Sequence, residues 1–170
     1  HVDVFNATTF APITTITTGL TTGMRDVTVA DGLLFVADTN DGDVNVFDAA
    51  TFAPITTISA GLNDPIKLDV HCGLLYVSDE TDGDVKVFNA TTFAPITTIT
   101  TGLSDPTGVA ATNQFIFVAD YDDGDVKVFE GVNCDVETIP TLSQWGTIAL
   151  SMIMLILGVV AVRQRIVLSV

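Results

Sequence analysis

The sequence predicts an all-β fold made of a repeated unit of about 41 residues. Sixteen residues, Phe5 to Leu20, recur unchanged from Phe88 to Leu103, and a variant with four differences lies between them. The phenylalanines at 5, 47, 88 and 129 recur at spacings of 42, 41 and 41 residues. Within each unit, apolar and polar residues alternate with a period of two, which is the period of a β-strand. A repeat near forty residues is typical of propellers and solenoids.

Each unit contains four short strands. The run 33–37 is apolar and ends at an Asp-rich turn, as a buried strand does. The segment 44–46 alternates, and 55–58 is entirely β-branched, which fits a pleated surface better than a helix. The remaining strand is weaker, and its copies are expected at 27–29, 66–70 and 108–111. Four antiparallel strands at this period form one propeller blade, so we expect a propeller-like array of four-stranded antiparallel blades.

Turn residues separate the expected strands. Asp-Gly occurs at 41–42, 82–83 and 123–124, Asp-Pro at 64–65 and 105–106, and Ala-Pro at 53–54. Glycine supplies the positive φ angles of a tight hairpin, and aspartate caps such turns with its carboxylate. These dipeptides therefore mark the ends of the strands.

The repeat resembles the NHL and YVTN families of β-propeller proteins. The resemblance rests on the run Leu-Phe-Val-Ala-Asp at 34–38, a polar turn, and Asp-Val-Asn-Val-Phe at 43–47, with copies near 75–88 and 116–129. It covers residues 1 to about 131 and implies a β-propeller domain over that range.

The array holds two complete units flanked by two partial ones. Residues 1–5 align with 43–47, and no copy of the Phe-Ala-Pro-Ile-Thr-Thr-Ile strand follows Phe129. Propellers close with about four to eight blades, so this array predicts a partial ring. We expect that further repeats and an export signal precede the numbered sequence. The alternative is that two or more chains complete one ring or join end to end by strand exchange.

The composition changes after a linker at 132–138. Residues 139–146 read Ile-Pro-Thr-Leu-Ser-Gln-Trp-Gly, and an apolar run over about 147–162 follows. This run predicts a hydrophobic helix of about 16 residues, short of the roughly 20 that cross a bilayer untilted. Trp145 suits a membrane interface, and Arg163 and Arg165 supply a positive cytoplasmic flank, which places the repeats outside the cytoplasm.

This tail resembles the IPTL-CTERM sorting domain of Gram-negative bacteria. The matching residues are Ile139, Pro140, Thr141, Leu142, Trp145 and Gly146, the apolar run, and Arg163 with Arg165. The resemblance implies that residues 139–170 are a sorting signal with a transmembrane helix. It also implies an exosortase-type membrane transpeptidase as partner, display at the cell surface, and at least transient anchoring. The extension 166–170 departs from the family pattern.

The Asp-rich turns are candidate cation sites. Short-spaced carboxylates are hard oxygen ligands that suit Ca²⁺, although the spacing differs from that of an EF-hand. The favoured interpretation is that the aspartates cap tight hairpins and together form a diffuse acidic face. The residues of this candidate face are Asp38, Asp41, Asp79, Asp82, Asp120 and Asp123.

Charge and cysteine content limit the function further. The 21 acidic and 6 basic residues give a formal charge of −15, which excludes nucleic acid as a partner. Cys72 and Cys134 match no metal-ligand spacing, and we expect free, partly buried thiols, although export permits a disulfide. His71 is expected at a strand end, as a surface or turn residue.

Three functions fit these patterns. The first is a non-enzymatic cell-surface or extracellular protein that displays an acidic propeller for binding, adhesion or matrix structure. Equivalent positions carry the same chemistry in each unit, whereas an active site needs different residues from different blades. The second is a fragment of a lactonase- or lyase-like propeller whose catalytic blades lie elsewhere. The third is a filament subunit that self-associates through its strand edges.

Overall fold

The computed structural model of the protein describes residues 1–132 and 134. Contacts divide the chain into two units, His1–Cys134 and Asp135–Val170. In the described part there are thirteen strands and no helix. The strands are β1 (Val2–Phe5), β2 (Pro12–Ile16), β3 (Met24–Ala30), β4 (Leu33–Asp38), β5 (Asp43–Asp48), β6 (Pro54–Ile58), β7 (Pro65–His71), β8 (Leu74–Asp79), β9 (Asp84–Asn89), β10 (Pro95–Ile99), β11 (Pro106–Ala111), β12 (Phe115–Asp120) and β13 (Asp125–Glu130).

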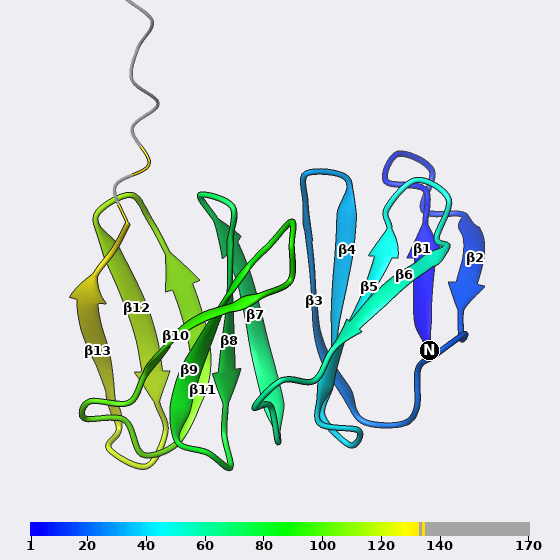
Figure 1. Cartoon of the computed structure of the whole chain (residues 1–170). Helices are drawn as coiled ribbons and strands as arrows, with labels where there is room; N and C mark the ends of the chain where they lie inside the picture. Colours follow the sequence, from blue (N-terminus) through cyan, green and yellow to red (C-terminus); the bar gives the residue numbers. More distant parts are fainter. Residues whose placement is uncertain (133, 135–170) are drawn as a thin grey trace, which may run out of the picture. The chain divides into compact units, whose positions relative to one another are not determined.

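The strands form four antiparallel sheets in which consecutive strands are neighbours, here named blades A to D (Figure 1). Blade A is β1–β2, blade B is β3–β6, blade C is β7–β10 and blade D is β11–β13. The predicted four-stranded antiparallel blade is confirmed in B and C. The weakly predicted strands are the first strands of blades B, C and D, and they extend further than expected, over 24–30, 65–71 and 106–111.

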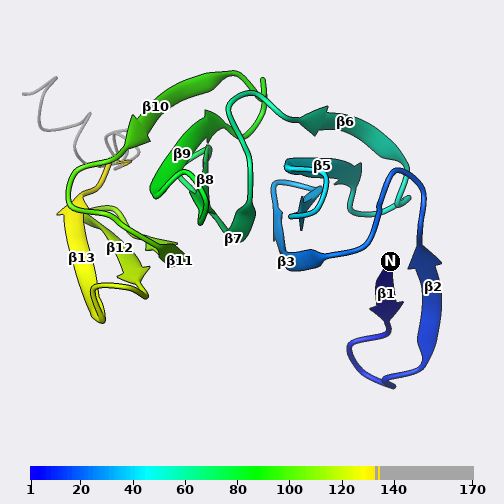
Figure 2. The same ribbon diagram turned by 90° about the horizontal axis from the view of Figure 1, so that it is seen from below.

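Edge strands carry the prolines of the repeat. Pro54 and Pro95 begin the fourth strands of blades B and C, and Pro65 and Pro106 begin the first strands of C and D. Proline has no N–H to donate, so it is tolerated at the first residue of an edge strand. In Figure 2 the first strands β3, β7 and β11 lie along one side of the blades, and the fourth strands β6 and β10 lie along the other.

The core lies between neighbouring blades. Because side chains alternate along a strand, β4 sends Leu34 and Val36 toward blade A, while Phe35 and Ala37 face blade C. Across the B–C interface they meet Leu68, Leu75, Val77 and Phe88, among others. The C–D interface is filled in the same way by Tyr76, Val85, Val87, Ile116 and Val118. Each blade therefore depends on its neighbours to bury its two faces.

Among the described residues, one face of blade D has no neighbouring blade, and the two-stranded blade A leaves the β3 side of blade B uncovered. Val128 of β13 is 55% exposed, whereas Val46, its equivalent in β5, is fully buried between blades B and C. Val27 of β3 is 48% exposed, whereas its equivalent Leu68 in β7 is 6% exposed. The same residue types are thus buried or exposed according to whether a blade covers them.

One expectation about this part of the chain is wrong. Cys72 and Cys134 form a disulfide across 62 residues of sequence, rather than remaining free thiols. Their spacing carries no information about this pairing, because the contact depends on how the segment after β13 returns to the β7–β8 turn. The apolar run predicted as a helix at 147–162 lies outside the described residues.

Candidate functional site

Aspartates at the ends of the second strands hold the loops that precede each blade's first strand. The Asp79 carboxylate is fully buried and accepts the backbone N–H groups of Asn63 (2.7 Å) and Asp64 (3.0 Å). A buried carboxylate is stable only where such donors replace water. Asp38 and Asp120 do the same: Asp38 accepts from Thr21, and Asp120 from Ser104 and Asp105. The amide donors at Asp120 outweigh the effect of its burial and lower its pKa.

The Asp-Gly turns lie against these same loops. Gly42 has a φ of 67°, and a Cβ there would lie 2.9 Å from the carbonyl oxygen of Asn63. Gly83 has a φ of 66° and approaches the carbonyl of Ser104 in the same way. The predicted positive φ is confirmed at both glycines, and the missing side chain also allows neighbouring blades to approach closely.

In blades C and D a lysine neutralises part of the negative charge of the turn between the second and third strands. The ammonium of Lys86 pairs with Asp82 at 3.0 Å and also with Asp84, while that of Lys127 pairs with Asp123 (2.8 Å) and Asp125 (2.6 Å). The hydrogen bond from Lys86 lowers the pKa of Asp82. Burial raises the pKa of Asp84 despite the same lysine. The hydrogen bonds that Lys127 donates to Asp123 and Asp125 raise the pKa of Lys127.

Blade B lacks this lysine. Asn45 occupies the equivalent position, donates to Asp43 Oδ1 at 2.8 Å, and accepts from the Thr57 hydroxyl at 2.9 Å. Burial, together with the charges of Asp38 and Asp41, raises the pKa of Asp43 to about 6. Among the three Asp-Gly turns of the described residues, the blade B turn is therefore the one whose aspartates, Asp41 and Asp43, form no ion pair with a lysine. The candidate cation-binding role of the six aspartates, the alternative to hairpin capping, stays a hypothesis.

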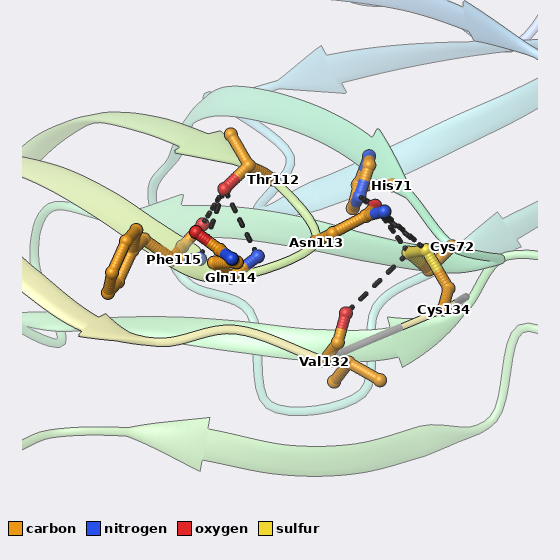
Figure 3. Close-up of a disulfide and its surroundings, with 8 residues drawn as sticks. All are labelled: His71, Cys72, Thr112, Asn113, Gln114, Phe115, Val132 and Cys134. Carbon is orange, nitrogen blue, oxygen red and sulfur yellow. Dashed lines mark hydrogen bonds between the residues drawn. A yellow bond between two sulfur atoms is a disulfide. The ribbon is translucent and has the colours of Figure 1, made fainter.

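A second cluster surrounds the disulfide (Figure 3). His71 ends β7, Cys72 follows in the β7–β8 turn with a φ of 56°, and Asn113 lies in the β11–β12 turn. Cys134 Sγ lies 3.7 Å from His71 Nε2 and 3.1 Å from Asn113 Oδ1. His71 Nε2 and Asn113 Oδ1 are 2.7 Å apart. These residues join two blades to the segment that follows β13.

Glycine allows that segment to reach the turns. Gly131 donates its N–H to the Gln114 carbonyl at 2.8 Å, and a Cβ at Gly131 would lie 2.7 Å from the backbone nitrogen of Phe115. Only a residue without a side chain fits this approach. Three residues after Gly131, Cys134 reaches Cys72.

The structure separates the sequence-predicted residues into groups. Asp38, Asp79 and Asp120 are buried loop anchors, whereas Asp41, Asp82 and Asp123 belong to the following turns. Within the described residues, one set of three side chains has metal-binding atoms that all lie within 4.8 Å, and it consists of His71, Cys72 and Cys134. Sequence reasoning missed this set. The only signal was the appearance of His and Cys at positions where blade B has Ala30 and Asp31.

The predicted sorting residues lie at positions 139–146, 163 and 165, outside the described residues. Over the part of the chain that the structure does describe, no helix is long and apolar enough to cross a membrane.

Comparisons with known proteins found matches to the C-terminal segment and to the blades. Residues 138–165 match the IPTL-CTERM motif. This span includes the Ile-Pro-Thr-Leu run, Trp145, Gly146 and both arginines. No curated protein matches the chain in sequence.

Solved structures similar to the chain include a β-propeller domain and two designed proteins. The crystal structure of the WD40 β-propeller domain of Doa1 matches with a TM-score of 0.63 and 19% identity, over 71% of this chain and 40% of that one. The computationally designed Ika4 protein matches with a TM-score of 0.55 and 18% identity, over 63% of this chain and 65% of that one. The designed Ika8 protein matches with a TM-score of 0.54 and 18% identity, over 63% and 33%.

The chain thus spans between a third and two thirds of the length of these structures. At such low identity the likeness concerns the fold, and the NHL or YVTN subtype stays a prediction. The protein is therefore an all-β repeat protein with the fold of β-propeller blades, followed by an IPTL-CTERM motif.

Proposed function

We propose that this chain is a non-enzymatic protein exported to the bacterial cell surface, where it displays its blades for binding or adhesion. The observation that carries the proposal is the IPTL-CTERM motif at 138–165, directly after the last blade. Such a motif is a sorting signal processed by machinery in the membrane, so a sorting transpeptidase is the expected first partner.

The charge of the chain suggests the class of surface partner. The formal charge is −15, and many of its carboxylates lie in the turns between the second and third strands. At these turns, each of Lys86 and Lys127 pairs with two carboxylates, so part of the negative charge remains uncompensated. A face of this kind attracts cationic polymers and cations by long-range steering. Because its chemistry repeats from blade to blade, it favours binding of an extended partner over catalysis.

Processing of the tail tests the proposal. The full chain, expressed behind an export signal in a host with a transpeptidase of this class, is expected to become accessible to protease at the cell surface and to lose mass at its C-terminus. A variant with Pro140→Ala and Trp145→Ala is expected to keep its full mass in the membrane fraction. A matched control, Gln144→Ala, lies at a variable position of the motif. Equal processing of all three would contradict the proposal.

Polylysine serves as the probe for the acidic face. We expect the chain to bind polylysine at low salt and to release it as salt rises, since exposed charges are screened within about 10 Å at 0.1 M salt. A variant with Asp41→Asn, Asp82→Asn and Asp123→Asn is expected to release it at lower salt. Identical salt curves would assign the attraction to other carboxylates.

A second candidate function is assembly of chains of this sequence, favoured by the two uncovered faces. The apolar residues Phe117, Val126 and Val128 of blade D are exposed, and their equivalents Phe35, Val44 and Val46 are buried at the B–C interface. Val27 and Val29 of blade B are exposed, and their equivalents in blade C, Leu68 and Val70, belong to that same interface. Blade A already covers Leu34, Val36 and Phe47 on that face of blade B, so the exposed part is the strip along β3. We infer that the exposed face of blade D packs on the β3 strip of a second copy, beside its blade A, in a head-to-tail contact.

Two variants test this assembly. Val128→Glu in blade D and Val29→Glu in blade B are each expected to make the full chain monomeric in mild detergent, measured by sedimentation velocity. Mixed in equal amounts, they are expected to form dimers, because each variant keeps one intact half of the interface. Tyr121→Glu, at an exposed turn residue, is the control and should leave assembly unchanged. A monomeric wild-type chain, or mixtures that stay monomeric, would contradict the contact.

A further inference from the structure

The disulfide lies among donor atoms suited to a thiophilic metal. Besides the sulfurs of Cys72 and Cys134, the cluster contains the Nε2 atom of His71 and the Oδ1 atom of Asn113. Sulfur and imidazole nitrogen are typical ligands of Zn²⁺, whereas carboxylates such as those of the turns are of the type that suits Ca²⁺. This cluster is therefore chemically distinct from the acidic turns.

The spacing of these atoms is close to that of a four-coordinate site. Zinc–ligand bonds of about 2.0–2.3 Å place neighbouring ligands of a tetrahedron about 3.3–3.8 Å apart. In the structure, Cys134 Sγ is 3.7 Å from His71 Nε2 and 3.1 Å from Asn113 Oδ1, while Cys72 Sγ is 3.9 Å from Asn113 Oδ1. His71 Nε2 and Asn113 Oδ1 are closer, at 2.7 Å, because the ring N–H donates to the amide oxygen. Metal binding needs the separation of the two sulfurs and the His71 tautomer with its proton on Nδ1, because an Nε2 atom that ligates zinc cannot also donate to Asn113.

His71 and Cys72 lie at positions that recur in blades B, C and D, but His and Cys occupy these positions in blade C alone. Blade B has Ala30 and Asp31 where blade C has His71 and Cys72. Asn113 holds the equivalent of the Cys72 position in the next blade, so the two neighbouring turns place their side chains together (Figure 3). All of His71, Cys72 and Cys134 are half-buried, which leaves a path for an ion. The formal charge of −15 further favours entry of a cation.

We propose that the reduced form of this protein binds Zn²⁺ through His71, Cys72, Asn113 and Cys134. The disulfide and the metal are then two alternative links between blade C and the segment that follows blade D. Before export the thiols are reduced and the metal site is available, whereas outside the cell the disulfide replaces it. This proposal is independent of the sorting of the tail and of the acidic face.

The change from the disulfide to the metal site takes two steps, reduction and metal binding. A phosphine reductant breaks the S–S bond and becomes its oxide with oxygen from water, and the two water protons go to the two sulfurs. Binding of one Zn²⁺ by the two thiols then releases two protons to solvent, so affinity is expected to rise with pH.

Cobalt substitution tests the site in the full chain, which is kept without a polyhistidine tag, in mild detergent with a phosphine reductant. We expect one Co²⁺ per chain, a thiolate-to-cobalt charge-transfer band and intense tetrahedral d–d bands, all lost when Zn²⁺ is added. His71→Ala introduces the residue of blade B and is expected to weaken binding on the order of 100-fold. His1→Ala removes the only other histidine and should change nothing. The oxidised chain should show no charge-transfer band.

Protection of the thiols gives a second readout. Zn²⁺ is expected to slow alkylation of both cysteines in the wild-type chain and in His1→Ala, but not in His71→Ala. A reduced wild-type chain without the charge-transfer band would overturn the proposal, as would equal binding by the two histidine variants. Either result can be obtained even if tail processing fails, so the two proposals are distinguishable.

Discussion

The Asp69 carboxylate accepts a hydrogen bond of 2.6 Å from the backbone N–H of Ala111, which joins the first strands of blades C and D. A first strand is the edge of its own sheet, so its outer N–H groups have no strand partner there. Asp26 does the same one blade earlier, accepting from Leu68 N at 2.8 Å and from the Lys67 ammonium at 3.2 Å. In both cases the donor lies 42 residues after the aspartate. These carboxylates link consecutive blades, in addition to the apolar packing between them.

Replacement of Asp69 should weaken this link. Asp69→Ala leaves the Ala111 N–H without its charged acceptor, and we expect unfolding free energy to fall by about 1–3 kcal/mol. Thermal unfolding followed by circular dichroism measures the change. Thr28→Ala, at the equivalent position of blade B, is the control and should cost less. Equal losses would mean that the hydrogen bond adds nothing beyond side-chain packing.

The buried anchor Asp79 should matter more than its exposed neighbour Asp82. Asp79→Asn removes the fully buried charge that accepts from the backbone N–H groups of Asn63, Asp64 and Asp82, and we expect the free energy of unfolding to fall by about 2–3 kcal/mol. Asp82→Asn breaks a partly exposed pair with Lys86, worth about 0–1 kcal/mol, and alters a 3.5 Å hydrogen bond from the Asn63 side chain. Chemical denaturation of both variants decides the order, and a larger loss in Asp82→Asn would contradict the anchor role.

Asp43 should make stability depend on pH. Its pKa in the folded chain is about 6, above the ordinary 3.8, so the folded state binds the proton more tightly than the unfolded state. The destabilisation is absent below pH 3.8, grows as pH rises through about 6, and is complete above it. Asp43→Asn should therefore stabilise the chain at pH 7 by on the order of 1 kcal/mol, after allowance for solvent screening.

The control for Asp43→Asn is the same comparison at pH 4, where most of the gain should disappear. A gain of equal size at both pH values would show that it does not come from ionisation. Asn45→Lys offers an independent check, because Lys86 and Lys127 occupy this position in the other blades. A lysine there should pair with Asp43 and reduce the same pH dependence.

A comparison of Gly42 and Gly124 distinguishes two ways in which a side chain would destabilise the turn: backbone strain and a steric clash with the next blade. Both have positive φ, at 67° and 68°, but a Cβ meets the Asn63 carbonyl only at Gly42 and meets nothing within 4 Å at Gly124. Gly124→Ala should cost about 1–2 kcal/mol from backbone conformation alone. Gly42→Ala should cost about 1–3 kcal/mol more, because the contact between blades must open. Equal unfolding midpoints for the two variants would show that the contact with Asn63 adds no destabilisation.

Loss of the disulfide should destabilise the oxidised chain. Cys72→Asn introduces a residue type that tolerates positive φ, which Cys72 and its blade B equivalent Asp31 both adopt, and it removes the bond to Cys134. We expect a loss of about 2–4 kcal/mol relative to the oxidised wild type, measured by thermal unfolding. In reducing buffer the two chains should unfold nearly together. A wild-type chain that reacts with two equivalents of alkylating reagent before reduction would contradict the pairing.

Much of the fold could be predicted from the sequence because its determinants are local. The apolar run at 33–37 and the alternating residues at 44–46 specify strands through side-chain periodicity alone. The Asp-Gly pairs specify tight turns, since glycine tolerates positive φ. The IPTL-CTERM motif is likewise a contiguous run of residues, so its match at 138–165 needed no structure.

The sites depended on residues that are distant in the chain. Asp79 is one of several turn aspartates in the sequence, and only the position of the loop at 63–64 shows that its carboxylate is an anchor. The cluster of His71 and Cys72 with Cys134 requires the segment after β13 to return to blade C. No spacing between 72 and 134 could indicate this.

By itself the sequence determined the period, the strands, the turns and the sorting motif, because each is set by neighbouring residues along the chain. The tertiary structure decided which repeated residues are buried: Val46 and Val128 occupy the same position in the repeat, yet one is covered by a blade and the other is not. Burial depends on whether another blade packs against the residue, and the sequence of one repeat does not show which blade lies next to it. The tertiary structure also decided the pairing of the two cysteines, for the same reason.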